Sequence, residues 1–144
     1  MTTWVVVADS SRGRIYVQDK PGNALMEVED LIHTGSRLHA GDLVSDRQGR
    51  DGGAVGQSRH VIDARTGVKE HEVETFAKEI AERLDSARVT GKYQRLVLMA
   101  PPAFLGTLRA NLSDKVRDLV VGEMDISIVT HTAEEVQQYL SQVV

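Results

Sequence analysis

The residues best suited to chemistry gather in one stretch, from Thr34 to Lys69. This stretch holds seven of the twelve glycines and shows no sustained apolar periodicity. Glycine lets a backbone approach a ligand closely, and the stretch has several at Gly49, Gly52, Gly53 and Gly56. Side chains nearby can contact phosphate groups, namely Arg47, Arg50, Arg59, His60 and Arg65. We therefore expect a long Gly- and Arg-rich loop at about 34–69 that binds an anionic partner. The alternative is a solvated loop without a ligand.

The charge distribution favours the same stretch. The chain has a formal net charge of −4, with 17 Lys and Arg against 21 Asp and Glu. Residues 34–69 carry six Lys and Arg against four Asp, a net +2, whereas residues 1–33 carry −2 and residues 70–144 carry −4. The overall acidity argues against broad polyanion binding, so an anionic partner is expected at 34–69. The stretch has no Walker-type Lys-Ser/Thr pair and no aromatic residue on which a base could stack.

A second candidate site follows two apolar runs that predict buried strands. ADSSRGR comes after Trp4–Ala8, and APPAFLG comes after Arg95–Ala100. Ligands of α/β sheets usually bind outside the carboxyl ends of parallel strands, and Pro102 opens a predicted helix whose N-terminus favours anions. Anion contacts are expected there from Asp9, Ser10, Ser11 and Arg12. The alternative is a turn in which Asp9 and Ser10 cap backbone amides.

Metal and nucleophile chemistry have weaker sequence support. Glu70, His71 and Glu74 fall within one helical turn, a spacing at which two side chains can share a metal ion. Acidic residues in a first turn are ordinarily exposed complements to the helix dipole, and no HExxH motif is present. The chain has no cysteine, and its other histidines define no triad with a serine and an acid. We expect no metal ion and no cofactor.

Periodicity predicts the elements that position these residues. Three strand-like runs joined by short turns predict an antiparallel meander: TWVVVADS, RIYVQD and ALMEVEDLIH. In the third run, Met26 and Val28 alternate with Glu27 and Glu29, which predicts a strand with one buried face and one solvent-exposed face. An amphipathic helix is expected from about Glu70, with apolar residues at Val73, Phe76, Ala77, Ile80, Ala81, Leu84 and Ala87.

The second half of the chain alternates strand and helix. RLVLMA and EMDISIVTH predict strands. One helix is expected from Pro102 through Leu119 with a break near Ser113, and another from a capping box at Thr132 and Glu135. The two continuous apolar strands belong at the centre of the sheet. The prediction is an α/β fold with a mixed five-stranded sheet in the order 3-2-1-4-5 and helices on both faces.

Length and composition indicate a single globular domain. At 144 residues, 41% hydrophobic and 26% charged, the chain fits a single domain over 1–144. No apolar run is long enough to predict a membrane span. The N-terminal sequence MTTWVVVADS shows no secretory signal, so we expect a cytoplasmic protein.

Four separated motifs resemble a known family. They are TWVVVADSSRGRIYV, DRQGRDGG, SRHVIDARTGVKEHEVETFAKEIAERL and APPAFLGTLRANL. Together they resemble the bacterial host attachment protein family, "protein required for attachment to host cells", over essentially the whole chain. That family in turn resembles the catalytic middle domain of archaeo-eukaryotic class 1 release factors and of Pelota. The resemblance implies an RNase H-like mixed sheet of five strands with flanking helices.

The same resemblance suggests a catalytic glutamine. In release factors, a long loop before the first long helix carries a GGQ motif, whose glutamine helps water hydrolyse the peptidyl-tRNA ester. Gly56 and Gln57 match the last two residues of that motif. Val55 stands where the first glycine should be, and a β-branched residue resists the positive φ that glycine allows. The incomplete motif favours a binding protein over an enzyme.

Three functional hypotheses remain. The first is a non-enzymatic domain that binds RNA or the ribosome through the basic Gly-rich loop. The second is a hydrolase of peptidyl-tRNA or a related ester that uses Gln57. The third is a factor in attachment to host cells, acting directly or indirectly, against which the missing export signal counts.

Overall fold

The strands of the molecule form one mixed sheet in the order β3-β2-β1-β4-β5. This computed structural model describes residues 1–33 and 58–144, with the backbone alone described for 58–69. β1 pairs antiparallel with β2 and parallel with β4, while β3 and β5 form the two edges. The strands are β1 (Thr3–Ala8), β2 (Arg12–Gln18), β3 (Met26–Ile32), β4 (Arg95–Met99) and β5 (Val120–Met124). The predicted fold class and strand order are confirmed.

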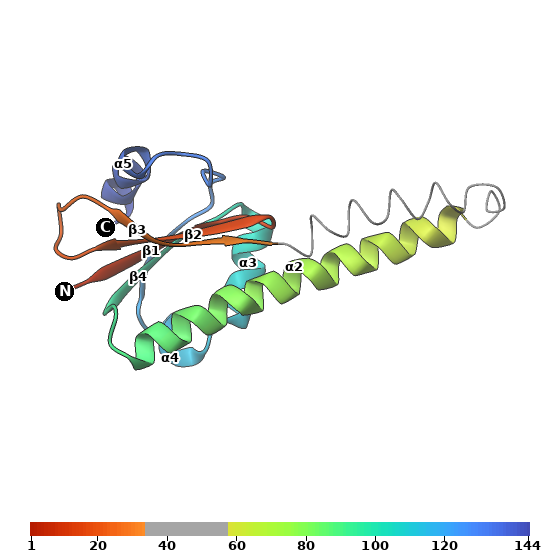
Figure 1. The fold of residues 1–144 in the computed structure, drawn as a ribbon, viewed down its shortest axis with the longest axis horizontal. Helices are drawn as coiled ribbons and strands as arrows, with labels where there is room; N and C mark the ends of the chain where they lie inside the picture. Colours follow the sequence, from red (N-terminus) through yellow and green to blue (C-terminus); the bar gives the residue numbers. More distant parts are fainter. Residues whose placement is uncertain (34–57) are drawn as a thin grey trace.

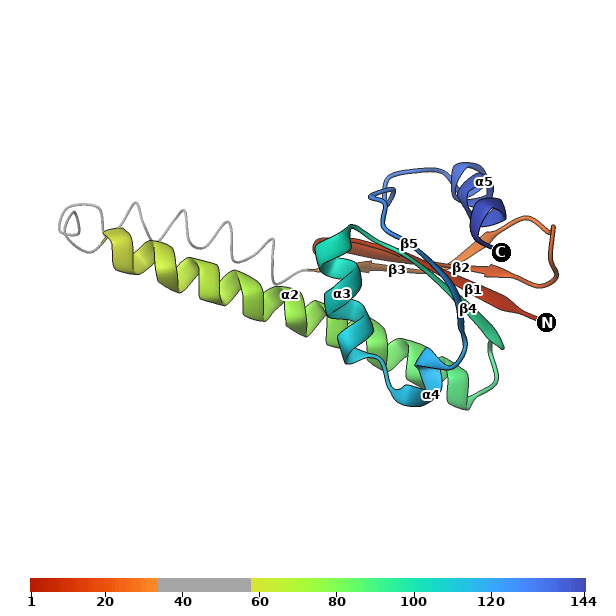
Figure 2. The same ribbon diagram turned by 180° about the vertical axis from the view of Figure 1, so that it is seen from behind.

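Helices cover both faces of this sheet (Figures 1 and 2). The crossovers from β1 to β4 and from β4 to β5 step in the same direction, so right-handed connections place both on one face. That face carries α2 (Ser58–Val89), α3 (Pro102–Asn111) and α4 (Asp114–Arg117), and the other face carries α5 (Ala133–Val143). The predicted break at Ser113 is confirmed, because this residue caps α4. The predicted capping box of Thr132 and Glu135 is confirmed at the start of α5.

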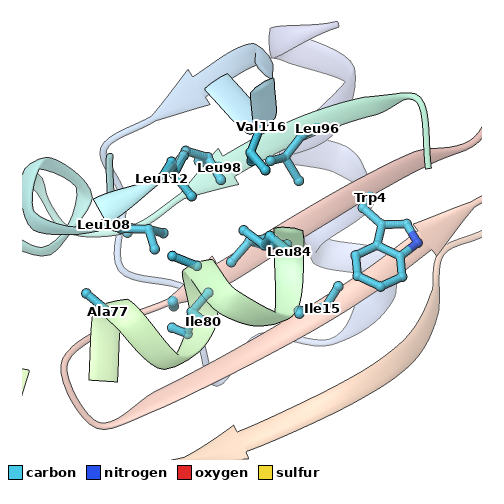
Figure 3. Close-up of a cluster of buried hydrophobic side chains, with 14 of the residues drawn as sticks. Trp4, Ile15, Ala77, Ile80, Leu84, Leu96, Leu98, Leu108, Leu112 and Val116 are labelled. Carbon is cyan, nitrogen blue, oxygen red and sulfur yellow. The ribbon is translucent and has the colours of Figure 1, made fainter. Parts of the chain in front are cut away.

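Each face of the sheet has its own hydrophobic core. β1 contributes to both, since Trp4, Val6 and Ala8 face α2 while Val5 and Val7 face α5. Figure 3 shows the larger core, with side chains from the sheet, α2, α3 and α4 interlocked. A central strand with both faces covered reads as a continuous apolar run, which is why β1 and β4 were predictable.

Helix α2 is longer than its sequence pattern predicts. It begins at Ser58, so residues 58–69, expected in the loop, are helical instead. Continuing the apolar stripe backwards from Val73 at the same spacing leads to Lys69 and Thr66, which are polar. Gly67 lowers the helix propensity further. The apolar pattern of a buried helix therefore begins only at Val73, well after the helix itself begins at Ser58.

The first half of α2 projects beyond the end of the sheet (Figures 1 and 2). A helix of 32 residues is about 48 Å long. The first described side chain of α2 that packs on the core is Val73, and Phe76, Ile80 and Leu84 are fully buried. The preceding turns therefore extend away from the packed domain.

Two strand predictions are wrong in detail. In β3, Met26 and Val28 are 67% and 44% exposed, although their alternation predicted a buried face. The register between β2 and β3 shifts at a bulge near Val28, which interrupts the two-residue alternation, and β3 is an edge strand. β5 was expected within residues 123–131 but spans Val120–Met124. Its start was missed because Gly122 divides the short apolar run with which the strand begins.

Candidate functional site

The predicted loop residues divide between helix α2 and the part of the chain outside the described residues. Arg59 and His60 lie in the first turn of α2. Six others lie outside the described residues: Arg47, Arg50, Gly52, Gly53, Gly56 and Gln57. The GGQ-like motif and the catalytic role of Gln57 therefore stay predictions.

The positive charge of the 34–69 stretch belongs to its helical part. Residues 34–57 carry three Arg against three Asp, which cancel. Residues 58–69 carry a net +2, from Arg59, Arg65, Lys69 and Asp63. The rest of α2, residues 70–89, carries three Lys and Arg against six Asp and Glu, a net −3. The charge thus changes sign along one helix, close to the point where that helix leaves the sheet.

The acidic half of α2 is fixed firmly to the domain. Phe76 packs against Phe104 of α3, with ring centroids 6.1 Å apart. Arg83 donates to Oε1 of Glu29 in β3 at 2.5 Å. Near the end of the helix, the buried hydroxyl of Tyr93 donates to the carbonyl oxygen of Leu84 at 2.7 Å. These contacts tie the helix to strands and helices on either side, so its projecting half has a rigid base.

A buried histidine joins the end of β3 to α2. His33 is only 6% exposed, and its ring stacks on Phe76 with centroids 4.8 Å apart. Its Nδ1 lies 2.8 Å from the carbonyl oxygen of Ser10. Its Nε2 lies 3.3 Å from Oε2 of Glu72 in α2, without the alignment of a hydrogen bond to any described residue.

The partners of His33 assign its tautomer. A carbonyl oxygen can only accept, so Nδ1 must carry a proton and donate it to Ser10. Nε2 then faces the Glu72 carboxylate either as a lone pair or, in the protonated ring, as half of an ion pair. Either way, the ring holds the end of β3 against α2. Sequence reasoning missed this role because the partners of His33 are distant from it in sequence, Ser10 after β1 and Glu72 and Phe76 on α2.

The turn after β1 is built mainly by Asp9. Its Oδ1 accepts hydrogen bonds from the backbone N–H groups of Ser11 at 2.8 Å and Arg12 at 2.9 Å. The backbone N–H of Asp9 in turn donates to the carbonyl oxygen of Arg12 at 2.9 Å. This geometry is that of a carboxylate capping a tight turn between paired strands, the alternative raised from the sequence. Anion binding by Asp9, Ser10 and Arg12 stays a prediction.

Arg12 already has an anionic partner within the chain. Its guanidinium makes two hydrogen bonds to the Asp30 carboxylate, at 2.9 and 2.6 Å. The hydrogen bonds hold the pKa of Asp30 below its ordinary value and raise the pKa of Arg12. The neighbouring Arg14 is similarly bound to Glu27 and also donates to the carbonyl oxygens of Val129 and His131. Both arginines therefore brace the sheet.

The remaining candidates lie on the surface. His71 and Glu74 are exposed on α2. Among the described residues, no group of three His, Cys, Asp or Glu side chains is placed to hold a metal ion. In the same part of the chain, no helix combines the length and apolar character that crossing a membrane requires.

Comparison with known proteins identifies the family. A search of curated proteins finds no significant match to the chain. The family model described as "Protein required for attachment to host cells" matches residues 4–140, which include all of β2 to β5, all of β1 except Thr3, and α5 as far as Leu140. The chain therefore belongs to this host attachment family.

Proposed function

We propose that this host attachment family member is a cytoplasmic, non-enzymatic protein that binds RNA, including the RNA of the ribosome, through the basic half of α2. The observation that carries the proposal is the reversal of charge along that helix, from +2 over residues 58–69 to −3 over residues 70–89. The resemblance to the release-factor middle domain adds support, because that domain acts at the ribosome.

The electrostatics favour contact at one end of the molecule. Phosphate groups attract Lys and Arg, and this attraction supplies most sequence-independent affinity for nucleic acid. The remainder of the chain is acidic and repels a polyanion, so approach is favoured only at the projecting half of α2. Residues 58–69 span about 18 Å of helix, enough to meet several phosphates. The proposal also counts Arg47 and Arg50, which precede the helix in sequence and lie outside the described residues, among the phosphate contacts.

The chemistry of this surface predicts its mode of binding. Residues 34–69 contain no aromatic side chain, so bases have nothing there on which to stack. Contacts to phosphate position a nucleic acid without identifying its sequence. We therefore expect salt-dependent binding with little sequence preference.

A pair of charge-matched variants tests the proposal. One variant replaces Arg59, Arg65 and Lys69 with Ala. The control replaces three exposed lysines elsewhere, Lys78, Lys92 and Lys115, and so removes the same charge. Binding to a fluorescein-labelled single-stranded RNA is followed by anisotropy over a range of KCl concentrations. The slope of log K against log salt should fall by about 2 in the first variant, because each phosphate contact on a single strand contributes about 0.7.

The control variant should keep the slope of the unmodified protein. Equal slopes in the two variants would show that only total charge matters, and affinity independent of salt would rule out phosphate contacts; either result overturns the proposal. Hydrolysis of the ester bond of peptidyl-tRNA by the unmodified protein, lost in Gln57→Ala, would instead support the hydrolase hypothesis.

A further inference from the structure

A small hollow lies at the end of the sheet opposite the projecting half of α2. Its volume is about 160 Å³. The walls come from the first residues of β1 and β4, the end of β2, the turn after β2 and the last turns of α5. Figure 1 shows the β2–β3 turn, α5 and both chain ends together at this side of the molecule. Neither the family description nor the proposed RNA-binding surface involves this hollow.

Arg95 supplies the charge of the hollow. It is the one charged side chain in the lining, which also includes Val144, the residue that carries the terminal carboxylate. Five other arginines of the described residues are ion-paired: Arg12, Arg14, Arg83, Arg88 and Arg109. No described carboxylate lies within ion-pair distance of Arg95. A guanidinium remains charged at any ordinary pH and presents paired donors that fit the two oxygens of a carboxylate.

Two buried polar side chains line the hollow together with Arg95. Thr3 is directly opposite Arg95 in the β1–β4 pairing and is only 3% exposed. Gln18 is 7% exposed, and its Nε2 donates to the carbonyl oxygen of Asn23 at 2.9 Å, which fixes the orientation of the amide. The Gln18 amide is thus held in place by the fold before any ligand arrives.

The hollow also has an apolar wall and a limited size. Leu140 of α5, 4% exposed, and Pro21 contribute apolar surface. A cavity of about 150 Å³ accommodates a molecule of about six heavy atoms. An apolar wall with a few convergent polar groups is the usual composition of a small-molecule site.

We propose that this hollow binds a small aliphatic carboxylate, with its two oxygens on Arg95 and its alkyl chain against Leu140. The hydroxyl of Thr3 donates a hydrogen bond to a carboxylate oxygen. Gln137, which also lines the hollow, closes one side of it. The site is independent of the basic half of α2, so either proposal can fail without the other.

Butyrate, butyramide and butylammonium test the proposal, because they carry similar alkyl chains but differ in charge, and butyramide also matches butyrate in the size and shape of its head group. Each is titrated into the full chain labelled with ¹⁵N, and amide shifts are followed by NMR. Butyrate should shift the signals of Thr3, Gln18 and Arg95 with a Kd of about 1 mM, as expected for about six heavy atoms. Arg95→Met should weaken binding at least tenfold, and Arg95→Lys should also weaken it because the paired donors are lost.

Lys92→Met is the matched control, since Lys92 is exposed close to Arg95 in sequence but does not line the hollow. It should bind butyrate as the unmodified protein does. The proposal is overturned if butyrate gives no saturable shifts at the hollow, or if butyramide or inorganic phosphate binds equally well. Unchanged affinity in a folded Arg95→Met or Arg95→Lys protein would also overturn it.

Discussion

Tyr93 should make the stability of the protein depend on pH in an unusually alkaline range. Its side chain is 2% exposed, stacks on Trp4 with centroids 5.1 Å apart and donates to the carbonyl oxygen of Leu84. Burial raises the pKa of Tyr93 from 10.0 to about 12. The folded state therefore favours the neutral phenol, and the unfolded chain loses the proton at a lower pH.

The magnitude follows from linkage between protonation and folding. A raised pKa in the folded state contributes stability that is fully present below the unfolded pKa of 10 and is lost as the pH rises towards 12. A difference of two pKa units corresponds to about 2.7 kcal/mol. At neutral pH, Tyr93→Phe should cost about 1 kcal/mol, the net value of one hydrogen bond. The two proteins should therefore reach equal stability between about pH 10 and 11, and above that range the variant should be the more stable.

Urea unfolding measures this crossover. Trp4 is the only tryptophan and lies against Tyr93, so the substitution itself changes the fluorescence signal. Unfolding should therefore also be followed by far-UV circular dichroism. Ionisation of Lys and of the other tyrosines affects both proteins and cancels in their difference. A stability difference that stays constant from pH 7 to about pH 11.5 would refute the reasoning, because it would mean that Tyr93 titrates equally in both states.

Two further substitutions test the packing on the α5 side of the sheet. Tyr16 is fully buried, and its hydroxyl has no hydrogen-bond partner among the described residues, so Tyr16→Phe should raise the free energy of unfolding by about 1 kcal/mol in urea titrations. A loss of stability would show that the hydroxyl is satisfied, for example by a bound water. A Cβ at Gly122 would collide with the Val143 side chain of α5, so Gly122→Ala should lower the thermal midpoint at a cost of about 1–3 kcal/mol. Gly106→Ala is its control, because a Cβ there meets no atom, and equal effects of the two changes would contradict the packing argument.

The sequence predicted the sheet well because its signals there are local. β1 and β4 are buried on both faces and read as continuous apolar runs. The capping box at Thr132 lies within four residues and needs no tertiary information. β3 was harder, since a bulge shifts its register and its acidic side chains point to arginines on β2 and α2. Such pairings depend on residues that are distant in sequence.

The sites depend on the same kind of long-range contact. His33 becomes a connection between β3 and α2 only when Ser10, Glu72 and Phe76 are brought to it. The hollow around Arg95 combines residues from four separate parts of the chain. No spacing rule joins such residues, and neither site produces a motif. By contrast, the turn at Asp9 was foreseen as an alternative because its acceptor and donors are neighbours.

Helix α2 shows why a projecting helical segment resembles a loop in sequence. An apolar stripe forms only where a helix faces a core, so it is present from Val73 onwards and absent from the projecting turns. Before Val73, packing on that core does not constrain which residue types the helix contains. The charge of this freed part is opposite to that of the anchored part and of the whole chain. The packing of the core does not require a positive charge in this segment. A binding partner for the projecting half of α2 would account for that charge.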